Sequence, residues 1–288
     1  MIAVLTTVVP VFSVVALGYA LGGPRGLQRR TLSNLALFVA SPALLFSVLS
    51  GVRLDPMRWG VLAGGTFFMA AGTALLAALY MRASGVGRGV LLPAVFFNGG
   101  NMGLACARLA YGPAGLEAGA LIFVSIAVLS AVFGIWIAKG ENGLREALRL
   151  PLVYGAAGGI AVSLTGIALP RIVAEPIDML GAMAIPLMLL TLGVQLRALA
   201  VRDVRDSLVA VAVRMGGGFA CALLFLSLLD ASEIDRKVLL LYSIMPPAVM
   251  NAVIAERYQT DPALVASAIT LGTLLSVAAI PAVLLFSR

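Results

Sequence analysis

Histidine is absent from this chain of 288 residues, and charged residues make up only 11% of it. The absence of histidine removes the commonest metal ligand and a frequent general base. The two cysteines, Cys106 and Cys221, lie in apolar runs without the spacing of a metal or redox motif, as is usual for small packing residues. No apolar run contains a nucleophile with a base, or paired aspartates. We therefore expect no enzyme, no metal site and no cofactor.

Hydrophobic residues are what the chain has in excess: they make up 61% of it, and the mean hydropathy is +1.06. This composition predicts an integral membrane protein. The N-terminal apolar run has no basic flank and no cleavage site, so we expect it to be a membrane helix and not a signal peptide. About 20 apolar residues cross the hydrocarbon core. The apolar runs then predict an all-α protein with ten spans, at 2–22, 31–50, 59–81, 89–111, 116–138, 151–169, 176–196, 205–229, 236–257 and 262–286.

Basic residues outnumber acidic ones, 20 to 13. Membrane proteins collect such charge in cytoplasmic loops, so we expect no nucleic-acid partner. The odd-numbered loops carry Arg25, Arg29, Arg30, Arg82, Arg88, Lys139, Arg145, Arg149, Arg197, Arg202, Arg205 and Arg257, whereas the even-numbered loops carry Arg53, Arg58, Arg171, Arg236 and Lys237. The positive-inside rule then predicts cytoplasmic odd loops, with both termini on the outer side of an inner (plasma) membrane.

Two of the expected spans are interrupted by residues that break a helix. The fourth contains the run Asn98-Gly99-Gly100-Asn101, and the ninth contains Pro246-Pro247 followed by Asn251. Hydrocarbon cannot satisfy a freed backbone, so these breaks must face protein or a wet cavity. Broken helices near the bilayer midplane form the solute sites of many secondary transporters. The substrate-binding residues predicted on this basis are Asn98, Gly99, Gly100, Asn101, Pro246, Pro247 and Asn251, with Ser41 as a further contact.

Unpaired N–H groups at the start of a half-helix favour an anion, and asparagine amides donate to carboxylates. The alternative is that the amides only satisfy broken backbone or helix–helix hydrogen bonds, and for Asn101 neither interpretation prevails. Gln195 is either a pathway residue or an interfacial one. For Arg108 and Arg214, we favour snorkelling to the interface over a role as steering charges on an anion pathway.

Acidic residues are missing from the centres of the spans, since every Asp and Glu lies in a loop or near a span end. A proton- or sodium-coupled carrier usually has an acid or a histidine at the midplane. This pattern favours an anion carrier driven by the gradient of its own substrate. Glu256 and Asp178 are the acids that could instead support coupling, and a sodium ion held by carbonyls, amides and hydroxyls is a weaker alternative.

The two halves of the chain share features at offsets of 144 to 148 residues: Pro42 and Pro186, Tyr111 and Tyr258, and the breaks at Asn98 and Pro246. A duplicated unit of five helices would insert its second copy in the opposite direction. We therefore expect one membrane unit over 1–288, built from inverted repeats at 1–138 and 151–288. Chance alignment of prolines is the alternative.

The chain resembles the auxin efflux carrier family in four segments: PALLF, NGGNMG…ARLAYG, IPLMLLTLG and MPPAVMNAVIAERYQTD…SAITLGTLLSVAAIP. It looks like the bacterial relatives of plant PIN-FORMED carriers, in the bile/arsenite/riboflavin transporter superfamily. The resemblance implies the fold of bile-acid symporters and sodium–proton antiporters, with ten helices in two inverted repeats and with helices four and nine broken and crossed. It also implies a scaffold of helices 1, 2, 6 and 7 that forms a homodimer, and a mobile domain of helices 3–5 and 8–10.

The fourth span departs from the family pattern N-T-G-F-x-G-x-P. It keeps Asn98, Gly100 and Gly103 but has Asn101 in place of the aromatic residue and Ala105 in place of the proline. The resemblance implies elevator-type alternating access for a small organic anion, either an aromatic monocarboxylate such as indole acetate or a dicarboxylate such as malate or malonate. The alternatives are a sodium- or proton-coupled symporter and, from another class, a non-transporting membrane receptor or assembly module.

Overall fold

The computed structural model describes residues 2–23, 27–52, 55–140 and 143–287, so Arg25 and Arg53 of the loop-charge comparison lie outside the described residues. Over these ranges the chain is helical and forms no strand. The elements are α1 (Ile2–Leu21), α2 (Arg29–Leu35), η1 (Ala36–Ala40), α3 (Ser41–Ser50), α4 (Pro56–Ser84), η2 (Arg88–Val90), α5 (Leu91–Val95), η3 (Gly99–Leu104), α6 (Ala105–Lys139), α7 (Leu144–Ala147), α8 (Pro151–Thr165), α9 (Arg171–Ala182), α10 (Ala184–Ala198), α11 (Arg205–Ala212), η4 (Val213–Gly217), α12 (Gly218–Leu228), α13 (Glu233–Ser243), α14 (Met250–Tyr258) and α15 (Pro262–Phe286). The expected all-α architecture is confirmed.

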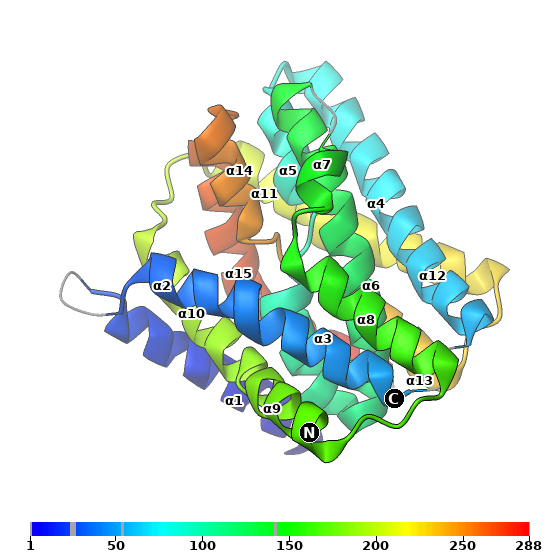
Figure 1. Cartoon of the computed structure of the whole chain (residues 1–288). Helices are drawn as coiled ribbons and strands as arrows, with labels where there is room; N and C mark the ends of the chain where they lie inside the picture. The colour runs from blue at the N-terminus through cyan, green and yellow to red at the C-terminus, as the bar shows by residue number, and fades with distance from the viewer. Residues whose placement is uncertain (1, 24–26, 53–54, 141–142, 288) are drawn as a thin grey trace.

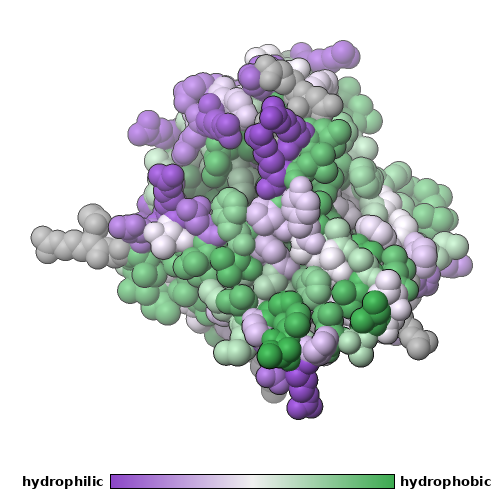
Figure 2. Space-filling view, viewed as in Figure 1, coloured by the Kyte–Doolittle hydropathy of each residue, from purple (hydrophilic) through white to green (hydrophobic). Residues whose placement is uncertain are grey.

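Among the described residues, six helical stretches are long and apolar enough to cross a membrane: Arg29–Ser50, Pro56–Ser84, Gly99–Lys139, Arg171–Ala198, Arg205–Leu228 and Pro262–Phe286. Two shorter apolar helices cover Thr6–Leu21 and Pro151–Thr165. Many large hydrophobic side chains on the outside of the protein are exposed, among them Leu75, Leu164 and Leu274. On the face shown in Figure 2, hydrophobic residues cover much of the middle, and hydrophilic ones gather mainly at the top and left. This surface suits a lipid environment.

The long helix α6 folds back on itself at Gly112-Pro113. Gly112 has φ of 67° and ψ of −151°, a conformation that glycine adopts readily, and Pro113 brings no backbone donor. A methyl group built on Gly119 would lie 3.3 Å from the Cβ of Ala107, although twelve residues of straight helix would separate the two by about 18 Å. The two parts of α6 are therefore packed against each other, which matches the separate spans expected at 89–111 and 116–138.

Two groups of helices can be distinguished. α1 packs against α10, and α3 packs against α8 and α9. In Figure 1, α3 and α8 run side by side across the front of the molecule. The contact between α1 and α10 is very close, because a Cβ built on Gly193 would lie 2.0 Å from the Val15 carbonyl oxygen. Helices with small residues at the interface approach in this way in membranes. The second group contains α4, which packs against α12, α5 and α6.

Candidate functional site

The two interruptions of the chain meet in the middle of the protein. Phe97 and Pro247 form an isolated antiparallel bridge between the segments that follow α5 and α13. The Asn98 amide donates to the Pro246 carbonyl at 2.8 Å, and the Ala248 amide donates to the Phe96 carbonyl at 2.9 Å. These two hydrogen bonds fix where four helix ends converge. We refer to residues 96–98 and 246–248 as the crossing.

Local sequence explains why the helices stop there. α5 ends at Val95, and Phe96 is already extended, with φ of −95° and ψ of 113°. Pro246 and Pro247 have no backbone donor and end the hydrogen-bond ladder of α13. Asn98 begins the next helical segment: its Oδ1 accepts a hydrogen bond of 3.2 Å from the Asn101 amide, as an N-cap does. The crossing is thus a local consequence of the residues that interrupt each span.

A cavity of about 430 Å³ opens beside the crossing, on the side where η3–α6 and α14 begin. Its polar lining residues are Ser33, Asn34, Asn98, Asn101, Ser130, Thr191, Gln195, Arg257 and Tyr258, and most of the others are apolar. No acidic side chain is among the described residues that line it. The first N–H groups of a helix have no acceptor within the helix and give that end a partial positive charge. Two such ends therefore face a cavity without negative charge.

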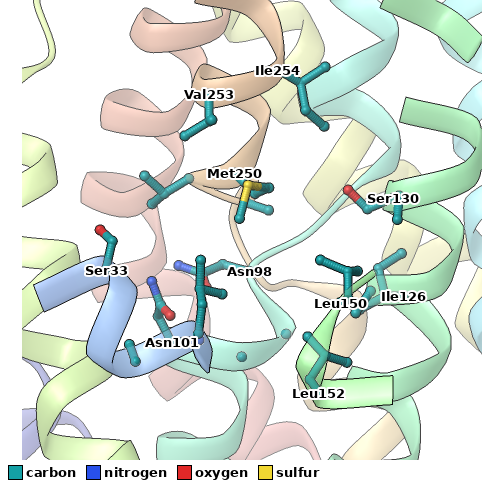
Figure 3. A pocket seen from close by; sticks show the side chains of 18 of the residues that line it. Ser33, Asn98, Asn101, Ile126, Ser130, Leu150, Leu152, Met250, Val253 and Ile254 are labelled. Atoms are coloured by element: carbon teal, nitrogen blue, oxygen red, sulfur yellow. The ribbon is translucent and has the colours of Figure 1, made fainter. Parts of the chain in front are cut away.

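The lining is divided into a polar part and an apolar part. Ser33, Asn98 and Asn101 lie together on one side in Figure 3, and Ile126, Leu150 and Leu152 lie on the other. Met250, Val253 and Ile254, from α14, occupy the upper part of the same view. A bound molecule would therefore meet Ser33, Asn98 and Asn101 at one end and mostly hydrocarbon around the rest, with Ser130 as a polar group on the apolar side.

Asn98 lines this cavity and has an unpaired, buried donor beside it. Its side chain is 4% exposed, and its Nδ2 has no hydrogen-bond partner among the residues that the structure describes. Gln195 is anchored through its Nε2, which donates to the Ser33 hydroxyl at 3.1 Å, while its buried Oε1 is left unpaired within the same described part of the chain. An unpaired buried donor costs about 1–3 kcal/mol, a cost that a bound acceptor would remove.

The sequence of residues 137–284 matches the family model described as membrane transport protein. The chain belongs to the membrane transport protein family. An uncharacterised transporter of Methanothermobacter thermautotrophicus is 29% identical to it over 300 residues, which cover 96% of this chain and 95% of the relative. A second uncharacterised transporter, of Methanocaldococcus jannaschii, is 26% identical over 199 residues, 65% of this chain and 64% of the relative. The expectation of a membrane transporter is confirmed at this level.

In this membrane transport protein, the predicted glycines Gly99 and Gly100 line the cavity together with Asn98 and Asn101. Asn251 has another position: it is 0% exposed, and its Nδ2 donates to the Phe96 carbonyl at 2.9 Å. Asn251 therefore ties α14 to the crossing and is not among the residues that line the cavity.

Pro246 and Pro247 are buried residues of the crossing itself, and a Cβ on Gly272 of α15 would lie 2.5 Å from Pro247 Cδ. They shape the crossing and are not among the residues that line the cavity.

Ser41 is fully buried and donates to the Ala36 carbonyl within the same helix. It thus supports the π-helical turn η1 and does not line the cavity. The polar lining residues from the same span are Ser33 and Asn34, which lie in α2.

The charged candidates are distributed differently from what we expected. Arg108 is exposed and does not line the cavity. The expectation of snorkelling is wrong for Arg214: Arg214 is 0% exposed and reaches backbone carbonyls inside the protein. Glu256 and Asp178 are exposed and do not line the cavity, and the Asp178 carboxylate accepts a hydrogen bond from Ser47.

Sequence reasoning missed several lining residues. Arg257 was expected only as a loop charge, but it lines the cavity and its guanidinium carbon lies over the Tyr258 ring at 5.4 Å from the centroid. Its position seven residues beyond Met250, or about 10 Å along α14, places a cation far from the crossing. Ser33, Asn34 and Ser130 carried no motif. The signal available for them was the presence of polar residues inside apolar spans.

Proposed function

We propose that the protein is a secondary transporter of small organic anions with an apolar body, for which an aromatic monocarboxylate is the best fit. The observation that carries this proposal is the unpaired Asn98 Nδ2 beside two helix starts, at one end of an otherwise largely apolar cavity. The cavity volume of about 430 Å³ lies within the usual range for ligand pockets, about 300–1,000 Å³.

The polar end of the cavity favours a carboxylate over a neutral group. A hydrogen bond to a charged partner contributes about 1.5–3 kcal/mol, compared with about 1 kcal/mol between neutral groups. Asn98 and Asn101 supply amide donors there, and the starts of η3 and α14 supply partial positive charge. Arg257 adds a full positive charge to the lining, so the field throughout the cavity attracts anions.

The apolar end favours one carboxylate over two. A dicarboxylate bound at the crossing would place its second charge among Ile126, Leu150 and Leu152, where burying an unpaired charge is costly. A longer diacid that reaches Arg257 is the exception. An aromatic or aliphatic body gains about 25 cal/mol for each Å² of apolar surface that it buries there.

We propose that the chain has ten transmembrane helices in two inverted repeats, at 1–138 and 151–288, with both termini outside. The two interruptions, 148 residues apart, support this organisation because each lies in the corresponding helix of its half. The end of α14, with Arg257 and Tyr258 at the cavity, lies at the opposite end of the molecule from both termini in Figure 1. In this orientation the cavity opens toward the cytoplasm.

The mechanism that we propose is elevator-type alternating access. Scaffold helices 1, 2, 6 and 7 correspond to α1, α2–α3, α8 and α9–α10, and the remaining helices form the mobile domain. The cavity lies between these groups, since Ser33, Leu152 and Met188 come from the first and Asn98 and Met250 from the second. Sliding the second group past the first would carry a bound anion with the crossing. A homodimer through the scaffold would hold the first group still.

The test is a matched set of ligands on purified protein: an arylacetate, its neutral amide, an arylethylamine and a short dicarboxylate. We expect a thermal shift and proteoliposome uptake with the arylacetate, a much smaller response with the amide and the dicarboxylate, and none with the amine. Binding without uptake would favour a receptor. Uptake that requires a sodium or proton gradient would favour a symporter, and preference for the amine would overturn the proposal.

A further inference from the structure

Arg214 is the largest fully buried side chain in the described part of the protein. It lies in the π-helical turn η4, between α11 and α12, and its guanidinium carbon is 4.9 Å from the centroid of the Phe97 ring. Among the residues that the structure describes, no carboxylate forms an ion pair with Arg214. A cation buried in this way needs a counter-charge from another source.

Two helix ends supply that counter-charge. Nη1 of Arg214 donates to the Val95 carbonyl at 2.9 Å, and Nη2 donates to the Ser243 carbonyl at 3.2 Å. Val95 is the last residue of α5, and Ser243 is the last residue of α13. The C-terminal end of a helix carries a partial negative charge, up to roughly −0.5, so the two ends together offset much of the guanidinium charge.

The space for the guanidinium is formed by a glycine. A Cβ on Gly218, one turn after Arg214, would lie 2.2 Å from Nη2 and 2.7 Å from the Ser243 oxygen. The neighbouring Gly216 has open space at the same point, with nothing within 4 Å. The guanidinium therefore needs the absence of a side chain at Gly218, whereas a side chain at Gly216 would not crowd it.

We propose that the carbonyl ends of α5 and α13 form a cation site at the crossing, and that Arg214 occupies this site permanently as a built-in cation. Carbonyl oxygens that converge inside a membrane protein are the usual ligands of a bare alkali-metal ion. With the guanidinium in place, the crossing is balanced without a sodium ion or a proton. In the proposed transporter, the anion would then move without cation coupling. Only this last step rests on the proposed function.

The test removes the built-in cation. Arg214→Met keeps much of the side-chain length and loses the charge, so the two carbonyl ends lose their partner. We expect its melting temperature to fall by roughly 5–15 °C. We also expect part of that loss to be recovered in sodium chloride, or in millimolar guanidinium chloride, but not in choline chloride of equal ionic strength. Wild type should melt at the same temperature in the sodium and choline salts.

Four further variants keep the proposal falsifiable if Arg214→Met fails to fold. Arg214→Lys retains the charge and should show no sodium dependence, although it loses one arm of the fork. Gly218→Ala should destabilise the protein much more than its control Gly216→Ala, because only the first crowds the guanidinium. Part of the destabilisation by Gly218→Ala comes from the close approach of the new methyl group to the Ser243 carbonyl, which occurs whatever side chain is at position 214. The alanine should therefore cost less in an Arg214→Lys background than in wild type.

The proposal is overturned if Arg214→Met shows no more cation dependence than wild type, if wild type is itself stabilised by sodium, or if Gly218→Ala melts like Gly216→Ala. None of these measurements uses a transported substrate. A failed ligand screen with sodium-dependent Arg214→Met would therefore reject the proposed function and leave the cation site standing. A successful ligand screen together with Arg214→Met that does not respond to sodium would reject only the cation site.

Discussion

The backbone amide of Asn98 donates to the Pro246 carbonyl at 2.8 Å, which joins the interruption in the first half of the chain to the interruption in the second. The helix ends on the two sides of this contact carry partial charges of opposite sign. The ends of α5 and α13 point their carbonyls toward Arg214, whereas the starts of η3 and α14 point toward the cavity. The protein thus has a cation on one side of the crossing and, on the other, the cavity that we propose binds an anion.

Asn98→Asp tests the donor without removing the N-cap. An aspartate oxygen still accepts from the Asn101 amide, and Asp is as good an N-cap as Asn. The Nδ2 donor is lost, and a negative charge faces the bound carboxylate. We expect an organic anion to bind at least tenfold more weakly, as measured by isothermal titration.

Asn98→Ala is the companion variant. It removes the cap as well as the donor, so it should lose about 1 kcal/mol of stability in addition to affinity. If Asn98→Asp binds the anion as tightly as wild type, the side chain of Asn98 has no part in anion recognition.

Asn251→Ala, in contrast to Asn98→Asp, should lower the stability of the protein more than its affinity for the anion. The Asn251 Nδ2 donates to the Phe96 carbonyl at 2.9 Å from a fully buried position, so the alanine removes one of the two hydrogen bonds that this carbonyl accepts, the other coming from the Ala248 amide, and costs about 0.5–1.5 kcal/mol. Gln259→Ala is the matched control, since Gln259 Nε2 also donates to a backbone carbonyl, that of Glu256, but from an exposed site. We expect denaturation of Asn251→Ala at a clearly lower temperature and near wild-type melting for the control. Loss of affinity in Asn251→Ala without loss of stability would place Asn251 in the binding site instead.

The interruptions could be predicted from sequence because Gly and Pro act locally. A Pro246-Pro247 pair ends a helix whatever surrounds it, and the Asn98–Asn101 run carries both a cap and two glycines. The end of α8 at Thr165, earlier than the expected 169, has the same kind of cause: Gly166 adopts φ of 65° and closes the helix. Features of this kind depend on a few adjacent residues.

The side chains around the crossing could not be assigned in the same way. Ser41 and Ser33 are both polar residues of one apolar span, and the π-helical turn between them changes which face each residue occupies. Helical periodicity alone therefore gives the wrong choice. Arg214 illustrates a second limit. Its partners are the backbone carbonyls of Val95 and Ser243, and a carbonyl is present in every residue, so no residue type signals the contact.

Cysteine accessibility tests the side on which the cavity opens. In a background with Cys106→Ala and Cys221→Ala, single cysteines would replace Met57, which is 75% exposed, Arg202, which is exposed, or Ser130 in the cavity. With odd loops in the cytoplasm, a membrane-impermeant maleimide should label Met57→Cys in intact cells. It should label the other two only in inverted vesicles. Saturating anion should slow the labelling of Ser130→Cys but not that of Arg202→Cys. The reverse labelling pattern would invert the proposed topology.

Arg257→Gln tests whether the cation in the cavity lining attracts the substrate. Arg257 lies about 10 Å along α14 from the crossing, close to the Debye length of about 10 Å at 0.1 M salt. Its contribution should therefore be modest and should depend on ionic strength. We expect the variant to bind an aromatic monocarboxylate roughly three- to tenfold more weakly at low salt, with much of the difference lost near 0.5 M salt. A long dicarboxylate that reaches Arg257 should lose more affinity than the monocarboxylate does.

The control is Arg202→Gln, which removes an exposed charge that does not line the cavity and should leave both affinities unchanged. Equal effects of the two variants would mean that overall charge, and not the position of Arg257, governs attraction of the anion.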